Sequence, residues 1–342
     1  MEIRILTNGT DLRRYNEWIL TNPEGSLWQS LERKHYLEAC GNSVRIYVAE
    51  DDPGHILASA LISIDKTTGG LSTWEIARGP LWTKSNQLVT ALLEKIINDA
   101  KDDRCIAVYF SPATVLPAHH DAFTTASRHV YPEATRIVDL TKTEDEILAQ
   151  MHPKGRYNIG VAKKHSIEVS EGSSGDIEAF YELLKGTGSR DGFKISQKSH
   201  YTRFLSHLRD SFILMANYQG KPVAGLIGVL WPPPLTPPPR GEGNFSRTGI
   251  YYYGASSYEH RHLMAPYLLQ WEAIRQCKNA GCMRYDLLGI APENAGTDDP
   301  WAGISDFKRK FGGTVVSYPP EQMIVLQPIV KKMLEWKRRV VG

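Results

Sequence analysis

The feature that most constrains this sequence is an order of predicted elements that occurs twice. The first occurrence has strand patterns over residues 3–6, 44–49, 55–64 and 74–81, helical patterns over 11–19 and 31–39, an amphipathic helix over 87–100 and a buried strand over 106–110. The second has helices over 177–184 and 201–208, strands over 212–218, 222–231 and 249–254, a helix over 265–279, a buried strand over 284–288 and a helix over 304–311. This repeated order predicts a duplicated α/β unit.

The length of 342 residues suits two domains of about 150 residues each. We predict an α/β (α+β) chain with a first domain over 1–140 and a second over 141–316. Strict β-α-β-α alternation and the glycine-rich phosphate-binding motifs are absent, which disfavours a nucleotide-binding doubly wound sheet. A run with six of the 20 prolines predicts a loop insertion at 232–246, either tolerated at a loop tip or a ligand for a proline-recognition module.

Charge and hydropathy limit the environment of the chain. Forty Lys and Arg against 38 Asp and Glu give a net charge of +2, which disfavours a strongly basic protein that coats nucleic acid. The longest apolar stretches, 58–64 and 224–231, are shorter than the roughly 20 residues of a membrane helix. Because Met1–Arg4 leads into no apolar signal segment, we expect a cytoplasmic protein. The basic residues over 331–339 allow peripheral contact with the inner face of a membrane; compensation of a helix dipole is the alternative.

The spacing of cysteines and histidines predicts neither disulfides nor a metal site. The four cysteines form no Cys-x-x-Cys pair, so we expect reduced thiols in or near the core: Cys40, Cys105, Cys277 and Cys282. His260 and His262 lack a third ligand at a known spacing, and we interpret them as surface histidines. We therefore predict no metal site.

Two clusters of cations could contact anionic ligands. In a helix starting near residue 155, Arg156 and Lys163 share one face with Lys164 beside them, which suits phosphate contact; a solvated surface helix is the alternative. Residues 190–201 read as a polar loop with cations at Arg190, Lys194 and Lys198. That loop either holds an anionic substrate or connects two domains.

Two aromatic clusters lie in the second half of the chain. Strand alternation places Tyr251 and Tyr253 on one face and Tyr252 on the other, where a second face could line a cleft. Phe307 and Phe311 share a helix face, and Lys308 lies beside it. Basic residues near a helix C-terminus also suit the helix dipole, so a structural role for this lysine stays open.

In their order and spacing these pieces resemble the Fem family of peptidoglycan-bridge aminoacyltransferases (FemA, FemB and FemX types). The resemblance covers nearly the whole chain and includes Gly25–Ser30, Arg78–Leu81, Lys154–Ile159, Arg190–Phe193, Tyr253–Ser256, Ala265–Tyr267, Tyr285–Ile290 and Phe307–Gly313. It implies tandem duplicated GNAT (acyl-CoA N-acyltransferase-like) domains, the first completed by the C-terminal segment 317–342. No heptad stretch could form the coiled-coil arm of many members, so the chain resembles the short FemX-like type.

The family transfers an amino acid from an aminoacyl-tRNA ester to an amine on the stem peptide of a peptidoglycan precursor. The resemblance therefore implies an aminoacyltransferase of cell-wall bridge formation, with aminoacyl-tRNA as co-substrate and a UDP- or lipid-linked muropeptide as acceptor. Exchange of an ester for an amide is downhill, so it requires neither metal nor redox cofactor. It requires alignment of a neutral amine and a positive group where the oxyanion develops.

The resemblance also assigns site residues. The family's Phe-Lys pair maps onto Phe307, which would shape the site, and Lys308, which would stabilise the oxyanion and the tRNA end. Tyr253 and Tyr201 match tyrosines that line the pentapeptide site.

The cations that hold the precursor's diphosphate in the family are replaced here. One aligns on Leu37, where Lys34 is the nearest substitute. A second aligns near 196–198, where Lys198 or Lys194 would serve.

Two other functions stay open at this point. An acyl-CoA-dependent N-acyltransferase would use the same fold, but it cradles pyrophosphate with a glycine-rich turn, and the turn at 257–263 contains no glycine. A non-catalytic RNA- or protein-binding module would keep the fold without the chemistry.

Overall fold

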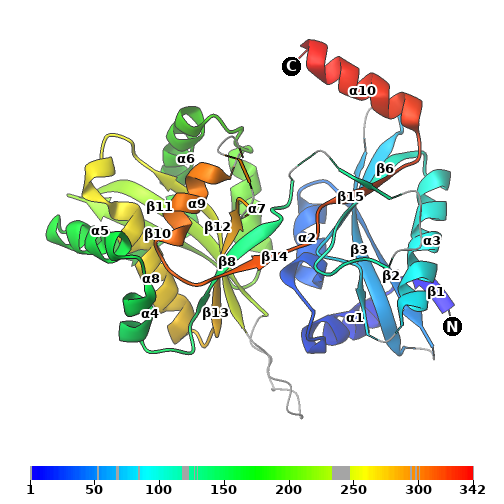
Figure 1. Ribbon diagram of the computed structural model, residues 1–342, viewed down its shortest axis with the longest axis horizontal. Coiled ribbons are helices and arrows are strands. Elements are labelled where there is room, and N and C mark those ends of the chain that lie inside the picture. The colour runs from blue at the N-terminus through cyan, green and yellow to red at the C-terminus, as the bar shows by residue number, and fades with distance from the viewer. Residues whose placement is uncertain are drawn as a thin grey trace. The chain divides into compact units, whose positions relative to one another are not determined.

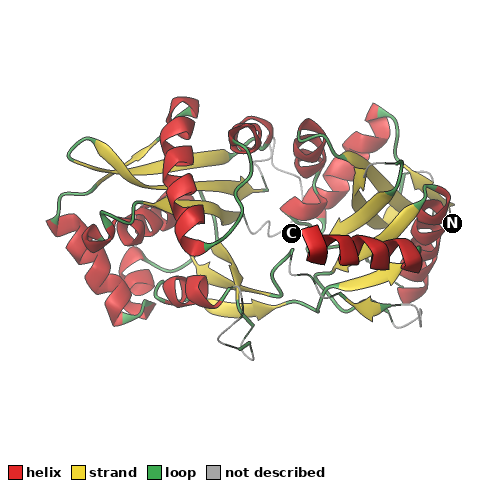
Figure 2. Cartoon of the chain, turned by 90° about the horizontal axis from the view of Figure 1, so that it is seen from above, coloured by secondary structure: helices red, strands yellow, loops and turns green. Residues whose placement is uncertain are grey.

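The computed structural model describes residues 2–51, 54–66, 69–83, 85–117, 123–126, 128, 130–232, 247–292, 295–296, 299 and 301–341. The chain divides into two compact units: unit 1 comprises Met1–Glu133 and Tyr318–Gly342, and unit 2 comprises Ala134–Ser317. Each unit is a sheet with helices on both faces (Figures 1 and 2). The proline-rich insertion predicted at 232–246 lies outside the described residues except for Pro232.

The sheet of unit 1 has the order β1-β2-β3-β4-β6-β15-β7, with β5 paired to β3. Its strands are β1 (Glu2–Ile5), β2 (Ser43–Glu50), β3 (Ile56–Lys66), β4 (Ser72–Ala77), β5 (Leu81–Trp82), β6 (Cys105–Ser111), β7 (Thr124–Thr125) and β15 (Gln322–Val325). The strands β1 to β4 form an antiparallel meander, β4 and β6 are parallel, and β15 is antiparallel to β6.

Helices of unit 1 begin where the sequence supplies a cap. They are α1 (Gly9–Thr21), α2 (Leu31–Ala39), α3 (Asn86–Asp102) and α10 (Pro328–Val341). Asn8, Ser30 and Ser85 accept hydrogen bonds from backbone N–H groups in the first turns of α1, α2 and α3. The apolar stripe of α3 then packs on the sheet face that carries Tyr47 and Trp74.

The sheet of unit 2 has the order β14-β8-β13-β12-β11-β10-β9. Its strands are β8 (Ala134–Asp139), β9 (Glu168–Glu171), β10 (Ser211–Tyr218), β11 (Lys221–Trp231), β12 (Thr248–Ser256), β13 (Arg284–Ile290) and β14 (Thr314–Ser317). The strands β9 to β12 form an antiparallel meander, β12 and β13 are parallel, and β8 is antiparallel to both β13 and β14.

Helices cover both faces of this second sheet. They are α4 (Glu144–Gln150), α5 (Pro153–Lys164), α6 (Ile177–Asp191), α7 (Lys198–His207), α8 (Ala265–Asn279) and α9 (Ala302–Arg309). The helices α5 and α8 share a core with Leu226 of β11. On the opposite face Phe180 of α6 lies against Gly225, where a Cβ atom would come within 2.7 Å of the ring. Helix α6 runs seven residues beyond its predicted end and stops at Gly192, which has a φ of +74°.

The two sheets share one topology, as the repeated order of elements predicted. Each has an antiparallel four-stranded meander, then a parallel strand, then an antiparallel strand. In unit 1 that last strand is β15, which comes from the C-terminal segment. In unit 2 it is β8, which precedes the meander in sequence. The predicted first domain extended to residue 140, but residues 134–139 are β8, whose pairing with β13 and β14 places them in unit 2.

Two of the motif segments meet in the core of unit 1. The fully buried side chain of Gln29 accepts a hydrogen bond from the Leu61 N–H at 2.7 Å and donates one to the Ala77 C=O at 2.7 Å. A Cβ atom at Gly79 would lie 2.6 Å from the Gln29 amide nitrogen, so only glycine leaves room for it. Gln29 and Gly79 thus serve packing and hydrogen bonding within unit 1.

Replacing Gln29 with leucine should therefore destabilise the protein. The substitution leaves one buried N–H and one buried C=O without partners, and we expect the free energy of unfolding to fall by about 2–5 kcal/mol. Urea denaturation measures the loss, with Gln87→Leu on the exposed surface of α3 as the matched control. Equal stability of the two variants would contradict this account.

Candidate active site

The site of unit 2 is opened by two parallel strands that separate. β12 pairs with β13 at Thr248, Gly249 and Ile250. Beyond Ile250 the ladder ends, although β12 continues to Ser256 and β13 to Ile290. Side chains rather than a neighbouring strand fill the space between the diverging ends, so a pocket can form there within the sheet.

A β-bulge at Tyr252 changes which tyrosines share a face. Ile227 of β11 pairs with Tyr253 and Gly228 pairs with Tyr251, so Tyr252 is an extra residue in β12. Tyr251 lines the pocket together with Gln270 of α8, whereas Tyr253 packs against Tyr201 of α7 on the opposite face of the sheet. The prediction that Tyr251 and Tyr253 share a face is therefore wrong, because it assumed strict alternation.

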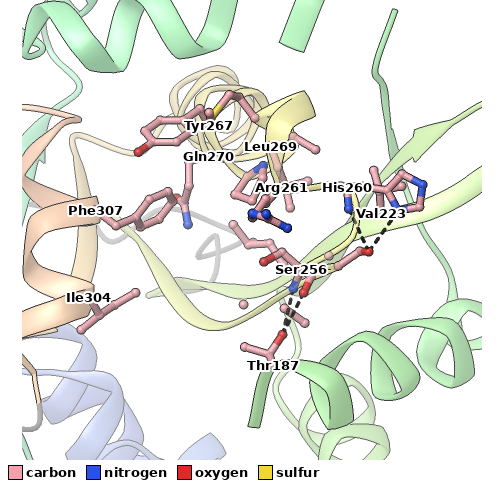
Figure 3. A pocket seen from close by; sticks show the side chains of 18 of the residues that line it. Thr187, Val223, Ser256, His260, Arg261, Tyr267, Leu269, Gln270, Ile304 and Phe307 are labelled. Atoms are coloured by element: carbon pink, nitrogen blue, oxygen red, sulfur yellow. Dashed lines mark hydrogen bonds between the residues drawn. The ribbon is translucent and has the colours of Figure 1, made fainter. Parts of the chain in front are cut away.

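A pocket of about 270 Å³ lies beside the part of β12 that follows the end of the β12–β13 ladder, and all of its lining residues belong to unit 2. Its walls come from the end of α6, from β11 and β12, from the turn before α8, and from one side each of α8 and α9 (Figure 3). Figure 3 shows Tyr267, Gln270 and Phe307 facing Ser256 and Arg261 across the opening. The pocket therefore combines an aromatic wall with a polar wall.

A buried polar network lies behind the pocket. Gln270 is almost fully buried in an otherwise apolar stretch of α8, and its Oε1 accepts a hydrogen bond from the Tyr285 hydroxyl at 2.8 Å. Tyr251 lines the same pocket as Gln270, and burial raises the pKa of Tyr251 to about 12. A Cβ atom at Gly254 would come within 1.9 Å of the Tyr251 hydroxyl oxygen, so Gly254 leaves the space that this phenol occupies.

The aromatic wall is a cluster of three rings. Tyr267, Phe307 and Phe311 lie with centroids between 5.1 and 5.8 Å apart. Phe307 and Tyr267 line the pocket, and Phe311 is buried behind them. The predicted site residue Phe307 thus lies in the pocket wall.

Lys308 lies next to the pocket and not in its lining. Its side chain is 4% exposed, and its Nζ donates to the Gly289 C=O at 2.6 Å. The same Nζ lies 5.6 Å from the ring centroid of Tyr251, which does line the pocket. Burial lowers the pKa of Lys308 to about 7, against the opposing effect of the Asp286 carboxylate. The neutral form of Lys308 is therefore more accessible than that of an exposed lysine.

The backbone of β13 is shaped to meet this lysine. Leu288 has a φ of +53°, which is uncommon for a residue with a side chain, and the pairing of β13 with β8 is irregular between Asp286 and Gly289. The Asp286 carboxylate accepts a hydrogen bond from the Leu288 N–H at 2.7 Å, which holds the turned backbone. The next carbonyl, that of Gly289, accepts the Lys308 ammonium.

The polar wall contains one predicted cation and one unexpected histidine. Arg190 lines the pocket, but its guanidinium is paired with Asp191 through Nε–Oδ1 and Nη2–Oδ2 contacts of 2.7 and 2.8 Å. His260 also lines the pocket, and its Nδ1 lies 3.0 Å from the Ser257 hydroxyl. His260 was interpreted as a surface histidine; it is half-buried, and it lies in the wall of the pocket because the turn before α8 folds into that wall.

The two predicted tyrosines lie together on the other face of β12. Tyr201 is 3% exposed, its hydroxyl accepts from the Ser196 N–H at 3.2 Å, and burial raises its pKa. Tyr253 packs edge-on against Tyr201 at 5.0 Å, and its hydroxyl lies 2.9 Å from His200 Nε2. Both residues thus belong to an aromatic cluster between α7 and β12.

The lysines predicted to hold a diphosphate are scattered. Lys34 lies in α2 of unit 1, where it forms an ion pair with Glu38 at 2.6 Å. Lys198 begins α7 of unit 2 and pairs with Glu178. Lys194 lies exposed in the short α6–α7 connection. The carboxylates of Glu38 and Glu178 partly neutralise the positive potential of Lys34 and Lys198, so these lysines would attract an anionic ligand less strongly.

Helix α5 carries the cations predicted to bind tRNA. Lys163 and Lys164 are exposed in its last turn. Arg156 donates from Nη1 to the carbonyls of Leu148, Ala149 and Met151 at the end of α4, so it holds two helices together.

The cysteines behave as expected of core thiols. All four are free; Cys105, Cys277 and Cys282 are buried, and Cys40 is half-buried. Among the described residues, no group of three or more His, Cys, Asp or Glu side chains is arranged to hold a metal ion.

Sequence reasoning missed Tyr251, Gln270 and His260 as site residues. A glutamine in the run Leu268–Trp271 is a recognisable signal, because a buried amide requires a polar partner. The bulge that separates Tyr251 from Tyr253 has no such signal, because three successive tyrosines fit either face equally well.

The sequence profile of the FemAB family matches residues 11–119, 114–219 and 244–336. The chain belongs to the FemAB family. It is similar to the lipid II:glycine glycyltransferase of Staphylococcus saprophyticus, with 22% identity over 89% of this chain and 89% of that protein. It is also similar to the UDP-N-acetylmuramoylpentapeptide-lysine N(6)-alanyltransferase of Weissella viridescens, with 24% identity over 87% of this chain and 89% of the other.

Solved structures establish the fold of this FemAB-family chain. The crystal structure of FemX superposes with a TM-score of 0.77 at 17% identity, over 98% of this chain and 100% of that one. A tandem GNAT protein from the clavulanic acid pathway superposes with a TM-score of 0.57 at 10% identity, over 95% and 98% of the two chains. The predicted tandem GNAT-like architecture is confirmed. Within the described part of the chain, no helix combines the length and apolarity needed to cross a membrane.

The buried Lys308 should make stability depend on pH in a defined direction. Its folded pKa of about 7 lies below the ordinary 10.5, so between these values the unfolded chain binds the additional proton, and the contribution of Lys308 to stability rises with pH. Between pH 7 and 10.5, the free energy of unfolding of wild type should rise by about 1.4 kcal/mol per pH unit relative to that of Lys308→Met. Urea unfolding at pH 6.5, 8 and 9.5 measures this gain.

The control for this comparison is Lys101→Met on the exposed end of α3. Its difference from wild type should stay constant over the same pH range. A constant difference for Lys308→Met would show that the lysine titrates normally in the folded protein.

Proposed function

We propose that this chain is an aminoacyltransferase that adds an amino acid, delivered as an aminoacyl-tRNA ester, to an amine on the stem peptide of a peptidoglycan precursor. The observation that carries the proposal is the match to the FemAB family along the chain, together with relatives that are named glycyl- and alanyltransferases. The pocket at the parted strands is the place where we put the ester.

The proposed reaction breaks the ester bond to the RNA ribose and forms an amide with the acceptor nitrogen. The amine proton goes to solvent or a base, and the ribose hydroxyl leaves with a proton. Such a step needs reactants held in line and positive charge near the tetrahedral oxyanion. Phe307 and Tyr267 would hold the aminoacyl end against an aromatic wall, and the Gln270–Tyr251 pair would fix the floor.

We assign the positive charge to Lys308. Its hydrogen bond to Gly289 and its place beside Tyr251 put the ammonium one side chain away from the pocket. Because desolvated charge interacts more strongly than charge in water, a buried lysine would act at short range on a bound ester. In this role Lys308 acts in its protonated form.

The acceptor is proposed to be a UDP- or lipid-linked muropeptide. The two relatives divide on this point, since one is named for lipid II and the other for a UDP-linked pentapeptide. In our proposal the reaction takes place in the cytoplasm, at the inner face of the membrane when the acceptor is lipid-linked. Tyr253, Tyr201, Lys194, Lys198 and Lys34 stay predicted acceptor contacts, while Arg190 is better placed at the pocket.

Replacing Lys308 with alanine should lower turnover by about 10² to 10³, the loss typical of one oxyanion-stabilising group. The assay combines purified protein, charged tRNAs, and UDP- and lipid-linked pentapeptides, with products read by mass spectrometry. Arg309→Ala is the matched control, because Arg309 neighbours Lys308 but is exposed and pairs with Asp306. Wild-type turnover in Lys308→Ala would remove this lysine from the mechanism.

The same assay separates the proposed activity from its alternatives. Transfer from acetyl-CoA without any effect of charged tRNA would identify an acyl-CoA-dependent enzyme. That reading is disfavoured because Pro266 opens α8 and removes one backbone N–H from the place where such enzymes bind pyrophosphate. A chain that binds tRNA or precursor but transfers nothing would be a binding module.

Lysines at the end of α5 should contribute to tRNA binding through phosphate contacts. The double variant Lys163→Ala/Lys164→Ala should weaken tRNA binding and reduce the slope of log affinity against log salt by about 1 to 2. Filter binding between 50 and 200 mM salt measures both. The control Lys66→Ala/Lys101→Ala removes two exposed lysines from unit 1 and should leave the slope unchanged. Equal slopes in all three proteins would place the RNA elsewhere.

A further inference from the structure

The C-terminal helix presents an apolar stripe that the described part of the protein does not cover. Ile329, Met333 and Trp336 follow one another at spacings of four and three residues, which puts them on one face of α10. They are 75%, 64% and 68% exposed. Such an exposed row of large apolar side chains, instead of scattered ones, indicates a binding surface.

The opposite side of α10 holds the helix on unit 1. Val330 and Leu334 are half-buried, and the helix contacts β6. Leu326, two residues before the helix, packs against the core that α3 forms with the sheet. Figure 1 shows α10 lying beyond the ends of β6 and β15. The helix is therefore anchored on one side and available on the other.

Charge on the same helix selects the partner. Lys332 is exposed and lies three residues after Ile329 and four before Trp336, so it borders the apolar stripe. The sequence of the helix contains five cations (Lys331, Lys332, Lys337, Arg338 and Arg339) against one acid, Glu335, which pairs with Lys331. An apolar stripe that contains tryptophan and is bordered by Lys332, on a helix whose sequence has a net positive charge, matches the interface of an anionic bilayer, where acyl chains meet phosphate.

We propose that α10 docks the protein on an anionic membrane surface, with Ile329, Met333 and Trp336 inserted at the level of the headgroups. At 14 residues and a rise of about 1.5 Å each, the helix is far shorter than the ~30 Å hydrocarbon core, so it lies in the plane of the interface. This surface belongs to unit 1 and does not depend on the proposed transfer reaction. If the acceptor is lipid-linked, docking holds the enzyme at the membrane that contains it.

Vesicle co-sedimentation tests the proposal on the full-length chain without any substrate. Wild type should bind vesicles containing one third phosphatidylglycerol, and bind phosphatidylcholine vesicles much less. The triple variant Ile329→Ser/Met333→Ser/Trp336→Ser should lose at least tenfold in binding to the anionic vesicles. Lys332→Gln should lose about fivefold at low salt and less at high salt.

The matched control is Val115→Ala/Tyr157→Ala, which removes two equally exposed apolar side chains, 76% and 69%, outside α10. It should bind vesicles like wild type. Thermal melting of every variant should match wild type, because the replaced side chains are exposed, and this shows that loss of binding is not loss of fold.

Three results would overturn the proposal. They are failure of wild type to bind anionic vesicles, equal binding by the triple variant, and a wild-type dimer that the triple variant converts to monomer without vesicle binding. The last result would identify a second copy of the chain as the partner of α10. Because no transfer step is measured, none of these results bears on the aminoacyltransferase activity, and failure of that activity would leave the vesicle result intact.

Discussion

The site of unit 2 depends on the separation of β12 from β13 after Ile250. Parallel strands in a continuous sheet would close the space with backbone hydrogen bonds, whereas here the ladder ends and leaves room for a pocket. The bulge at Tyr252 acts at the same point, because it turns Tyr251 toward α8 and leaves Tyr253 against α7. The end of the β12–β13 ladder and the bulge in the β11–β12 pairing thus occur at neighbouring residues of β12, and together they set which side chains reach the pocket.

The same separation explains why a lysine can be buried beside the pocket. Past the end of the ladder β13 is free to take the positive φ of Leu288, and the carbonyl of Gly289 then accepts the Lys308 ammonium. Burying a charge is unfavourable unless it is paired or hydrogen-bonded, and one carbonyl with two aromatic rings compensates it incompletely. The lowered pKa of Lys308 follows from this incomplete compensation.

Periodicity predicted most helices and meander strands, because each has an apolar face that repeats every two or 3.6 residues; α8 matched its prediction from Ala265 to Asn279. Pairing partners were not predictable in the same way. β8 alternates like any edge or inner strand, and nothing within 134–139 says which sheet it joins. Arg156 has the spacing of a phosphate-binding residue, yet three nearby carbonyls at the end of α4 take its hydrogen bonds. The local sequence pattern therefore predicts a helix or strand, whereas contacts with residues outside that element decide which sheet a strand joins and what a side chain binds.

The C-terminal origin of β15 in the sheet of unit 1 has a consequence for α10. In the sheet of unit 1, β15 lies between β6 and β7. Because β15 follows unit 2 in the sequence, the sheet of unit 1 is completed only by residues that come after all of unit 2. The pairing of β15 with β6 ends at Val325, α10 begins three residues later at Pro328, and Leu326 packs against the core between them. Val330 and Leu334 are half-buried on α10, so the helix also packs on unit 1 beyond its first residue. A helix already formed and packed on its unit loses less conformational entropy on binding a planar surface than a flexible tail of the same composition.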